Sequence, residues 1–233
     1  MPNAESSRPV VTIPVEARIL GENDRLAAAN RARFTTQGLF VVNLISSPGA
    51  GKTTLLVETL CALAGRLHCA VIEGDQQTDC DARRIAETGA PVVQINTGQA
   101  CHLDAGLVTA AADQLDLAGV DLLFIENVGN LICPAEFDLG EDAKAVLMSV
   151  TEGEEKPVKY PLIFHLAACT LLTKCDLLPV LRFNLPACEE NLRKVSPSAP
   201  VFHTSAYQPE SLADWLAWLQ AGVAAKRNQT ASA

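Results

Sequence analysis

The sequence predicts an α/β fold in which a mostly parallel, twisted sheet carries helices on both faces. Three observations predict this class. Strand-like and helix-like segments alternate from residue 39 to residue 220, at the spacing of strand–helix–strand units. A glycine-rich loop follows the first apolar run, and charged side chains directly follow several later runs. Because parallel strands end at one edge of a sheet, these side chains are expected to meet there, where ligands bind.

Composition narrows the class of protein. The chain has 233 residues, of which 48% are hydrophobic, enough for one large domain with a sizeable core. A formal net charge of −9 argues against a nucleic-acid-binding surface. No apolar stretch approaches the ~20 residues of a membrane-spanning helix, and the N-terminus does not have the pattern of a signal peptide. We therefore expect a cytoplasmic protein with no nucleic-acid or membrane partner, whose 8 cysteines are thiols.

Two terminal segments flank the predicted domain. Residues 1–37 are expected to form a loose tail and one helix, over 22–33, where small and apolar side chains recur at helical spacing. A nucleotide-binding domain is expected over 38–222, followed by a flexible tail over 223–233. Apolar runs bounded by turn residues predict its strands, at 39–45, 69–73, 91–96, 121–126, 145–150, 168–173 and 201–204. Its helices are expected at 53–67, 78–87, 103–115, 189–195 and 211–220.

Residues 46–54 have the features of a phosphate-binding loop between a strand and a helix. In such a loop small residues let backbone N–H groups surround the phosphates, a lysine reaches the β- and γ-phosphates, and the next hydroxyl ligates Mg²⁺. Lys52 and Thr53 are placed for the last two roles, and Ser46 stands where the strict pattern has its first glycine. The predicted nucleotide contacts of the loop are Pro48, Gly49, Ala50, Gly51, Lys52, Thr53 and Thr54.

Carboxylates at the ends of two apolar strands are the candidates for holding Mg²⁺ together with Thr53. Glu126 ends one strand, where a Walker B acid lies, and Gly129 follows in a loop whose N–H could meet the γ-phosphate. Asp75 lies just past another strand and is a candidate for binding Mg²⁺ or orienting the attacking water. Lys52 and Asp75 are thus the predicted catalytic residues. The structural alternatives are a strand-capping glutamate and an ordinary loop aspartate.

A strand-end lysine and aspartate predict that the base is guanine. The carboxylate of Asp176 can accept two hydrogen bonds from guanine N1 and N2, and the stem of Lys174 can lie on the ring, whereas adenine lacks that pair of donors. Ser205 and Ala206 follow a later strand and are expected near the guanine O6. The familiar form of the motif has Asn where Thr173 stands, which is expected to weaken a loop-bracing contact.

Two thiols and an imidazole form a second candidate site. Cys101 and His102 are adjacent before a predicted helix, and Cys133 follows the loop after Glu126. Soft sulfur and nitrogen ligands suit Ni²⁺ or Zn²⁺ better than Mg²⁺. Three ligands leave a four-coordinate site incomplete, and a two-fold dimer could complete it. A structural thiol beside a surface histidine is the alternative.

On these motifs the chain resembles the HypB family, GTPases that help to insert nickel into [NiFe]-hydrogenase. The resemblance covers roughly residues 16–221 and rests on the segments 46–56, 73–84, 101–104, 126–141 and 149–161. It implies a P-loop GTPase fold of the SIMIBI class that dimerises with nucleotide, and GTP and Mg²⁺ as ligands. It also implies that Cys101, His102 and Cys133 hold Ni²⁺ or Zn²⁺ at the dimer interface. The implied partners are a second copy of the chain, a HypA-type nickel chaperone and the hydrogenase large subunit.

The chain departs from many relatives in its first 37 residues, which contain neither cysteine nor histidine, so no nickel capture is expected there. Slow intrinsic turnover is expected because no arginine finger can be picked from the sequence. Three other readings remain: a urease-type nickel GTPase, a P-loop kinase that uses ATP, and a metal-binding module that keeps nucleotide only as structure. The segments 130–134 and 152–161 favour the hydrogenase type over the first. A kinase would need neither the guanine-reading pair nor the thiol–imidazole cluster.

Overall fold

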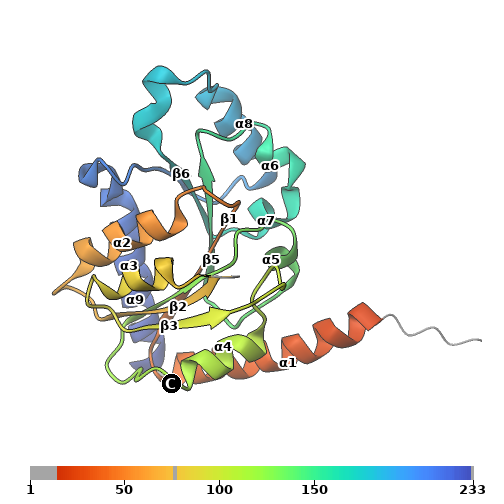
Figure 1. Ribbon diagram of the computed structural model, residues 1–233, viewed down its shortest axis with the longest axis vertical. Helices are drawn as coiled ribbons and strands as arrows, with labels where there is room; N and C mark the ends of the chain where they lie inside the picture. Colours follow the sequence, from red (N-terminus) through yellow and green to blue (C-terminus); the bar gives the residue numbers. More distant parts are fainter. Residues whose placement is uncertain (1–14, 76–77, 232–233) are drawn as a thin grey trace, which may run out of the picture.

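A seven-stranded sheet organises the molecule, which the computed structural model describes over residues 15–75 and 78–231. The strand order is β3-β2-β4-β1-β5-β6-β7, and every pairing is parallel. Helices cover both faces of this sheet (Figure 1), which confirms the predicted α/β class. The strands are β1 Phe40–Ser46, β2 Cys69–Asp75, β3 Val92–Asn96, β4 Leu122–Glu126, β5 Ala143–Ser149, β6 Cys169–Thr173 and β7 Val201–His203.

The helices connect successive strands, as parallel pairing requires. The first seven are α1 Val15–Thr36, α2 Lys52–Leu63, α3 Cys80–Ala86, α4 Ala105–Ala112, α5 Cys133–Glu136, α6 Lys156–Lys159 and α7 Pro161–Leu166. Two 3₁₀ helices and the last two α-helices follow, namely η1 Cys175–Val180, α8 Leu185–Val195, η2 Pro209–Leu212 and α9 Ala213–Ala231. None of the helices in the described ranges is long and apolar enough to cross a membrane.

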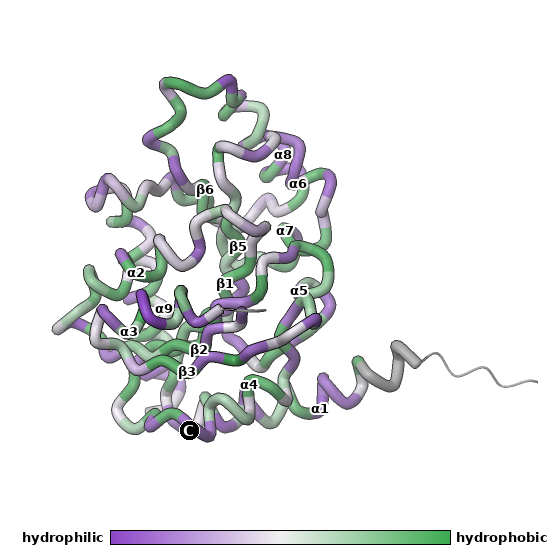
Figure 2. Tube along the Cα trace, viewed as in Figure 1, coloured by the Kyte–Doolittle hydropathy of each residue, from purple (hydrophilic) through white to green (hydrophobic). Residues whose placement is uncertain are grey.

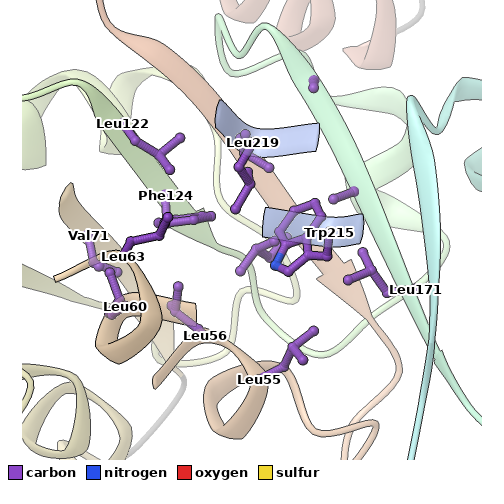
Figure 3. Close-up of a cluster of buried hydrophobic side chains, with 14 of the residues drawn as sticks. Leu55, Leu56, Leu60, Leu63, Val71, Leu122, Phe124, Leu171, Trp215 and Leu219 are labelled. Carbon is purple, nitrogen blue, oxygen red and sulfur yellow. The ribbon is translucent and has the colours of Figure 1, made fainter. Parts of the chain in front are cut away.

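The central strands are buried on both faces because helices lie on each. All seven residues of β1 are buried, and the hydrophobic colour in Figure 2 gathers along the central strands. On one face Val42 and Leu44 belong to a cluster with side chains of α2 and α9, among them Trp215 and Leu219 (Figure 3). The Trp215 indole donates to Thr59 Oγ1 at 3.0 Å, so its one polar atom is satisfied inside the core.

Helix α1 belongs to the folded body and packs against α4. The buried Asn30 side chain donates to the carbonyls of Ala105 and Leu139 at 2.9 and 3.1 Å. The helix extends beyond the predicted 22–33, to Thr36 at its C-terminal end. The predicted loose tail over residues 1–14 lies outside the described residues.

The prediction of a flexible C-terminal tail from residue 223 is wrong for the described part. Helix α9 continues to Ala231 and ends beside α1 (Figure 1). Val223 continues the apolar stripe of Trp215 and Leu219 into the core. Lys226 is 5% exposed and donates to Asp142 Oδ1 at 2.6 Å, which fixes the last turns of the helix.

Candidate functional site

The loop between β1 and α2 has the form of a phosphate-binding loop. Gly49 and Gly51 have φ of 73° and 92°, a left-handed conformation that glycine adopts without strain. A cavity of about 470 Å³ opens above this loop. Predicted site residues that line it are Pro48, Gly49, Gly51, Lys52, Thr53, Thr54, Asp75, Glu126, Gly129 and Lys174.

Polar contacts join the loop to the end of β4. Thr53 Oγ1 donates to Glu126 Oε1 at 2.7 Å, so two predicted magnesium ligands are in contact. Lys52 Nζ donates to Ser46 Oγ at 3.1 Å, so the serine that replaces the first glycine of the pattern accepts from the lysine. Burial lowers the pKa of Lys52, and the charge of Glu126 opposes this. The lysine is thus held at the cavity floor beside a carboxylate.

Sequence reasoning missed Glu73, a second buried carboxylate beside Glu126. The two residues are partners in the β2–β4 register and are 2% and 3% exposed. Burial raises the pKa of Glu126 to about 7, opposed by the charge of Lys52. Burial, and then the charge of Glu126, raises the pKa of Glu73 to about 8. The Oε2 atom of each carboxylate has no hydrogen-bond partner. Oxygens of this kind fit a hard cation such as Mg²⁺.

The remaining carboxylates and one missed cation come from the segment around α3. Asp75 Oδ2 accepts from the N–H and the hydroxyl of Thr78, at 3.0 and 2.8 Å. Arg84 donates to Thr54 Oγ1 at 3.1 Å and pairs with Asp81 at 3.3 Å, and both line the cavity. Arg84 ends the 73–84 segment that carries the family resemblance, but its contact with Thr54 depends on how α3 folds back onto α2.

The predicted base-reading residues gather around a neighbouring cavity of about 240 Å³. Lys174 has a φ of 59°, and its Nζ donates to the Gly49 carbonyl at 2.7 Å. Asp176 Oδ1 accepts from Ser205 Oγ at 2.6 Å, which orients the carboxylate. The predicted residues that line this cavity are Ala50, Gly51, Thr54, Lys174, Asp176 and Ala206.

Thr173, which stands where the familiar motif has Asn, makes a loop-bracing contact. That this contact is weaker than one made by Asn stays a prediction. Thr173 is buried, and its hydroxyl donates to the Ala50 carbonyl at 2.6 Å. A hydroxyl on β6 therefore makes a direct contact with the phosphate-binding loop.

The three predicted soft ligands come together, as expected. Cys101 Sγ lies 3.1 Å from Cys133 Sγ and 3.6 Å from His102 Nδ1, and one ligand atom of each residue lies within 4.8 Å of the others. All three side chains are half-buried. The hydrogen bond with Cys101 raises the pKa of the Cys133 thiol, and burial lowers the pKa of His102. Two sulfurs and a nearby imidazole nitrogen suit a soft or borderline cation.

Two asparagines connect this group to the cavity. Asn127, directly after Glu126, accepts through Oδ1 from the Leu103 N–H at 3.1 Å. Asn130 Nδ2 donates to the Cys101 carbonyl at 3.2 Å. The loop that follows β4 is therefore bonded to the loop that carries Cys101 and His102.

Comparison with known proteins gives close relatives. The domain described as CobW/HypB/UreG, nucleotide-binding domain, matches residues 40–203. The hydrogenase maturation factor HypB of Azotobacter chroococcum mcd 1 is 56% identical over 208 residues, which cover 89% of this chain and 68% of that protein. The hydrogenase/urease maturation factor HypB of Helicobacter pylori (strain J99 / ATCC 700824) is 42% identical over 207 residues, covering 87% of this chain and 85% of that protein.

Solved structures agree with these relatives. The crystal structure of HypB from Helicobacter pylori in complex with nickel matches with a TM-score of 0.83 at 40% identity, covering 90% of this chain and 97% of that chain. FlhF complexed with GMPPNP and Mg²⁺ matches with a TM-score of 0.55 at 17% identity, covering 82% and 77%, a likeness of fold alone. These matches confirm the predicted SIMIBI-type P-loop fold. At this level of identity over most of its length, the chain belongs to the HypB family of hydrogenase maturation factors.

Proposed function

We propose that this protein is a GTP-hydrolysing nickel metallochaperone that assists nickel insertion into the large subunit of [NiFe]-hydrogenase. The single observation that carries the proposal is the hydrogen bonding between the loop after β4 and the Cys101–His102 loop, through Asn127 and Asn130. The soft ligands Cys101, His102 and Cys133 are thus connected to the phosphate-binding cavity through the hydrogen-bonded loop after β4. The family's role in hydrogenase maturation supplies the context.

In this proposal the cavity binds GTP with its phosphates over the loop and its base beside β6. Lys52 neutralises the β- and γ-phosphates, Gly129 donates its N–H to the γ-phosphate, and Asp75 orients the attacking water. The base is held by Lys174, Asp176, Ser205 and Ala206. Thr53, Asp75 and Glu126 would hold Mg²⁺, which would neutralise charge on the phosphates.

Cys101, His102 and Cys133 would hold the cargo, Ni²⁺, and would also accept Zn²⁺. Two copies of the chain would share ligands across a two-fold axis and complete the coordination. Contacts to the γ-phosphate would shift the loop after β4, and the two asparagines would transmit the shift to the metal ligands. A HypA-type chaperone would share the delivery.

Calorimetric titration of nucleotide-free protein with GDP and then ADP, each with Mg²⁺, tests the base preference. Tight binding of GDP and negligible binding of ADP is expected, because Asp176 would be left unpaired by adenine. Equal binding, or a preference for ADP, would mean that the base loop does not select guanine. Phosphate that appears on an acceptor after incubation with ATP, and not in solution, would establish a kinase.

Nickel delivery to urease is a second candidate function, because the 42% identical Helicobacter pylori relative is named as a maturation factor for hydrogenase and urease. Incubation of GTP and nickel-loaded protein with metal-free hydrogenase large subunit, and separately with urease apoprotein, distinguishes the two. Nickel transfer to the large subunit alone is the expected result.

A further inference from the structure

Two buried carboxylate oxygens lie unpaired at the floor of the cavity. Glu73 Oε2 and Glu126 Oε2 are the only buried side-chain nitrogen or oxygen atoms without a hydrogen-bond partner in the described ranges, 15–75 and 78–231. The two residues lie side by side in the β2–β4 register and both line the cavity. A buried carboxylate without a donor costs free energy, and a second one beside it adds repulsion.

The cations around the cavity make their closest contacts elsewhere. Lys52 donates to Ser46, Arg84 to Thr54 and Asp81, and Lys174 to the Gly49 carbonyl. Glu126 has at least one donor, the Thr53 hydroxyl. Glu73 is 2% exposed and lines the cavity, so its partners are limited to what the cavity holds. A donor for Glu73 must therefore arrive with whatever occupies the cavity.

Depth in the strand limits how Glu73 can meet a metal ion. It precedes Asp75 by two residues, about 7 Å further from the carboxyl edge at the usual rise of a strand, and both side chains are on the same face. Its register partner Glu126 lies at the same depth but accepts from Thr53, the predicted Mg²⁺ ligand of the loop. Mg²⁺ beside nucleotide phosphates keeps several of its waters, and these waters are strong hydrogen-bond donors. The Glu73 carboxylate, further from the edge than the predicted ligand Asp75, is therefore suited to accept a hydrogen bond from a water bound to the ion.

We propose that Glu73 is a positioning residue for the Mg²⁺ of the bound nucleotide, and that its Oε2 accepts a hydrogen bond from a water on that ion. This inference rests on the proposed function, because it requires a guanine nucleotide with Mg²⁺ in the cavity. It assigns the unpaired carboxylate a partner that comes with the ligand. Outer-shell partners of this kind orient the inner ligands of a metal.

The variant Glu73→Gln keeps the shape of the side chain and removes its charge. In the nucleotide complex, the affinity for the metal ion is expected to fall. A residue retained only for packing would leave the affinity for the metal ion unchanged.

The test measures the affinity for GMPPNP by calorimetry, once with excess EDTA and once with saturating Mg²⁺. The affinity with Mg²⁺ divided by the affinity in EDTA is expected to exceed one in wild-type protein. In Glu73→Gln this ratio is expected to fall about tenfold, the lower end for losing an outer-shell partner. Affinity in EDTA is expected to stay at the wild-type value or to increase. The EPR signal of Mn²⁺ bound to the GMPPNP complex provides a second readout.

Asp81→Asn is the matched control, because Asp81 lines the same cavity but is 42% exposed and pairs with Arg84. Its ratio is expected to stay near that of wild type. A wild-type ratio in Glu73→Gln, or an equal loss in Asp81→Asn, would overturn the inference while GMPPNP binding by wild-type protein leaves the proposed function intact. Wild-type protein that does not bind GMPPNP, or gains nothing from Mg²⁺, would overturn both.

Discussion

At the scale of single residues, Thr173 and Ser46 fill positions where the usual motifs have other residues. Thr173 donates to the Ala50 carbonyl, and Ser46 accepts from Lys52. In both cases a short hydroxyl side chain bonds directly to the phosphate-binding loop. The chemistry of the contact is retained although the residue type differs, so these departures do not by themselves argue for weak nucleotide binding.

Thr173→Val tests the brace, because valine has the shape of threonine without its hydroxyl. The Ala50 carbonyl would lose this donor in a buried environment, and the free energy of unfolding is expected to fall by about 1–3 kcal/mol. Affinity for GDP is expected to fall as the loop loosens. Denaturant unfolding and calorimetry measure the two effects. Thr173→Ser keeps the hydroxyl and should retain both the stability and the affinity for GDP. A Val variant as stable as wild type would show that this hydrogen bond does not stabilise the fold.

Residues whose chemistry follows directly from a motif could be predicted, and residues that depend on packing could not. Lys52, Thr53 and Glu126 follow from the loop and strand patterns, and they do meet at the cavity. Glu73 carried a usable signal, because residues two apart in a strand share a face and Asp75 was already a candidate. Arg84 ends the 73–84 motif, but no local pattern predicts its contact with Thr54, since that contact joins two helices.

At the scale of secondary-structure elements, α1 is held to the domain by the loop that precedes β5. Arg31 makes two contacts of 2.7 Å with the Asp138 carboxylate, and Asn23 donates to the Asp138 carbonyl at 2.8 Å. Burial would raise the pKa of Asp138, but the Arg31 guanidinium and the Gly140 N–H together hold it below its usual value. The ionised carboxylate is therefore the form that attaches the helix.

This lowered pKa predicts how stability depends on pH. A carboxyl group whose folded pKa is below its unfolded value of about 3.9 stabilises the fold above that value, and the contribution is lost as pH falls through the folded pKa. Asp138→Asn is therefore expected to lower the melting temperature at neutral pH, and the difference from wild type should disappear in strong acid. Glu155→Gln, an exposed carboxyl in a helix-end pair, is the control. A difference that persists unchanged in acid would contradict the prediction.

The sequence prediction missed the short helices α5, α6 and α7 and the ends of α1 and α9. The apolar stripe of α9 continues through Val223, but the polar residues after it gave no periodic signal. Lys226 stabilises this region through Asp142 and Thr35, contacts more than eighty residues away in sequence. The sheet could be predicted because each strand is a local apolar run. The helix ends depend on distant partners that no local pattern reveals.

At the scale of the whole molecule, a metal ion bound by Cys101, His102 and Cys133 is expected to join two copies of the chain. Cys133→Ala removes one of three ligands, and Ni²⁺ affinity is expected to fall more than about 100-fold, since losing even an outer-shell partner costs 10–100-fold. Competition with a chelator measures the affinity, and sedimentation with Ni²⁺ and GMPPNP measures dimerisation, which is expected to weaken as well. Cys80→Ala, at an exposed free cysteine, is the control. Wild-type Ni²⁺ affinity in Cys133→Ala would exclude this site.

The proposed gating requires the nucleotide and metal sites to be coupled through the loop after β4. Asn130 Nδ2 donates to the Cys101 carbonyl, so movement of that loop would displace a metal ligand's own backbone. If GMPPNP and GDP stabilise different positions of the loop, Ni²⁺ affinity must differ between the two complexes, typically 5–150-fold for coupled sites. Asn130→Ala is expected to bring the ratio of the two affinities close to one.

Competitive titration of Ni²⁺ into the GDP and GMPPNP complexes measures that ratio. Asn191→Ala is a matched control, because Asn191 also donates through its amide to a backbone carbonyl, that of Glu154, at 3.1 Å, but in α8. Equal Ni²⁺ affinity in the two wild-type complexes would exclude gating by the nucleotide. A full ratio retained in Asn130→Ala would mean that coupling runs through Asn127 or another contact, because only the Cys101 bond has been cut.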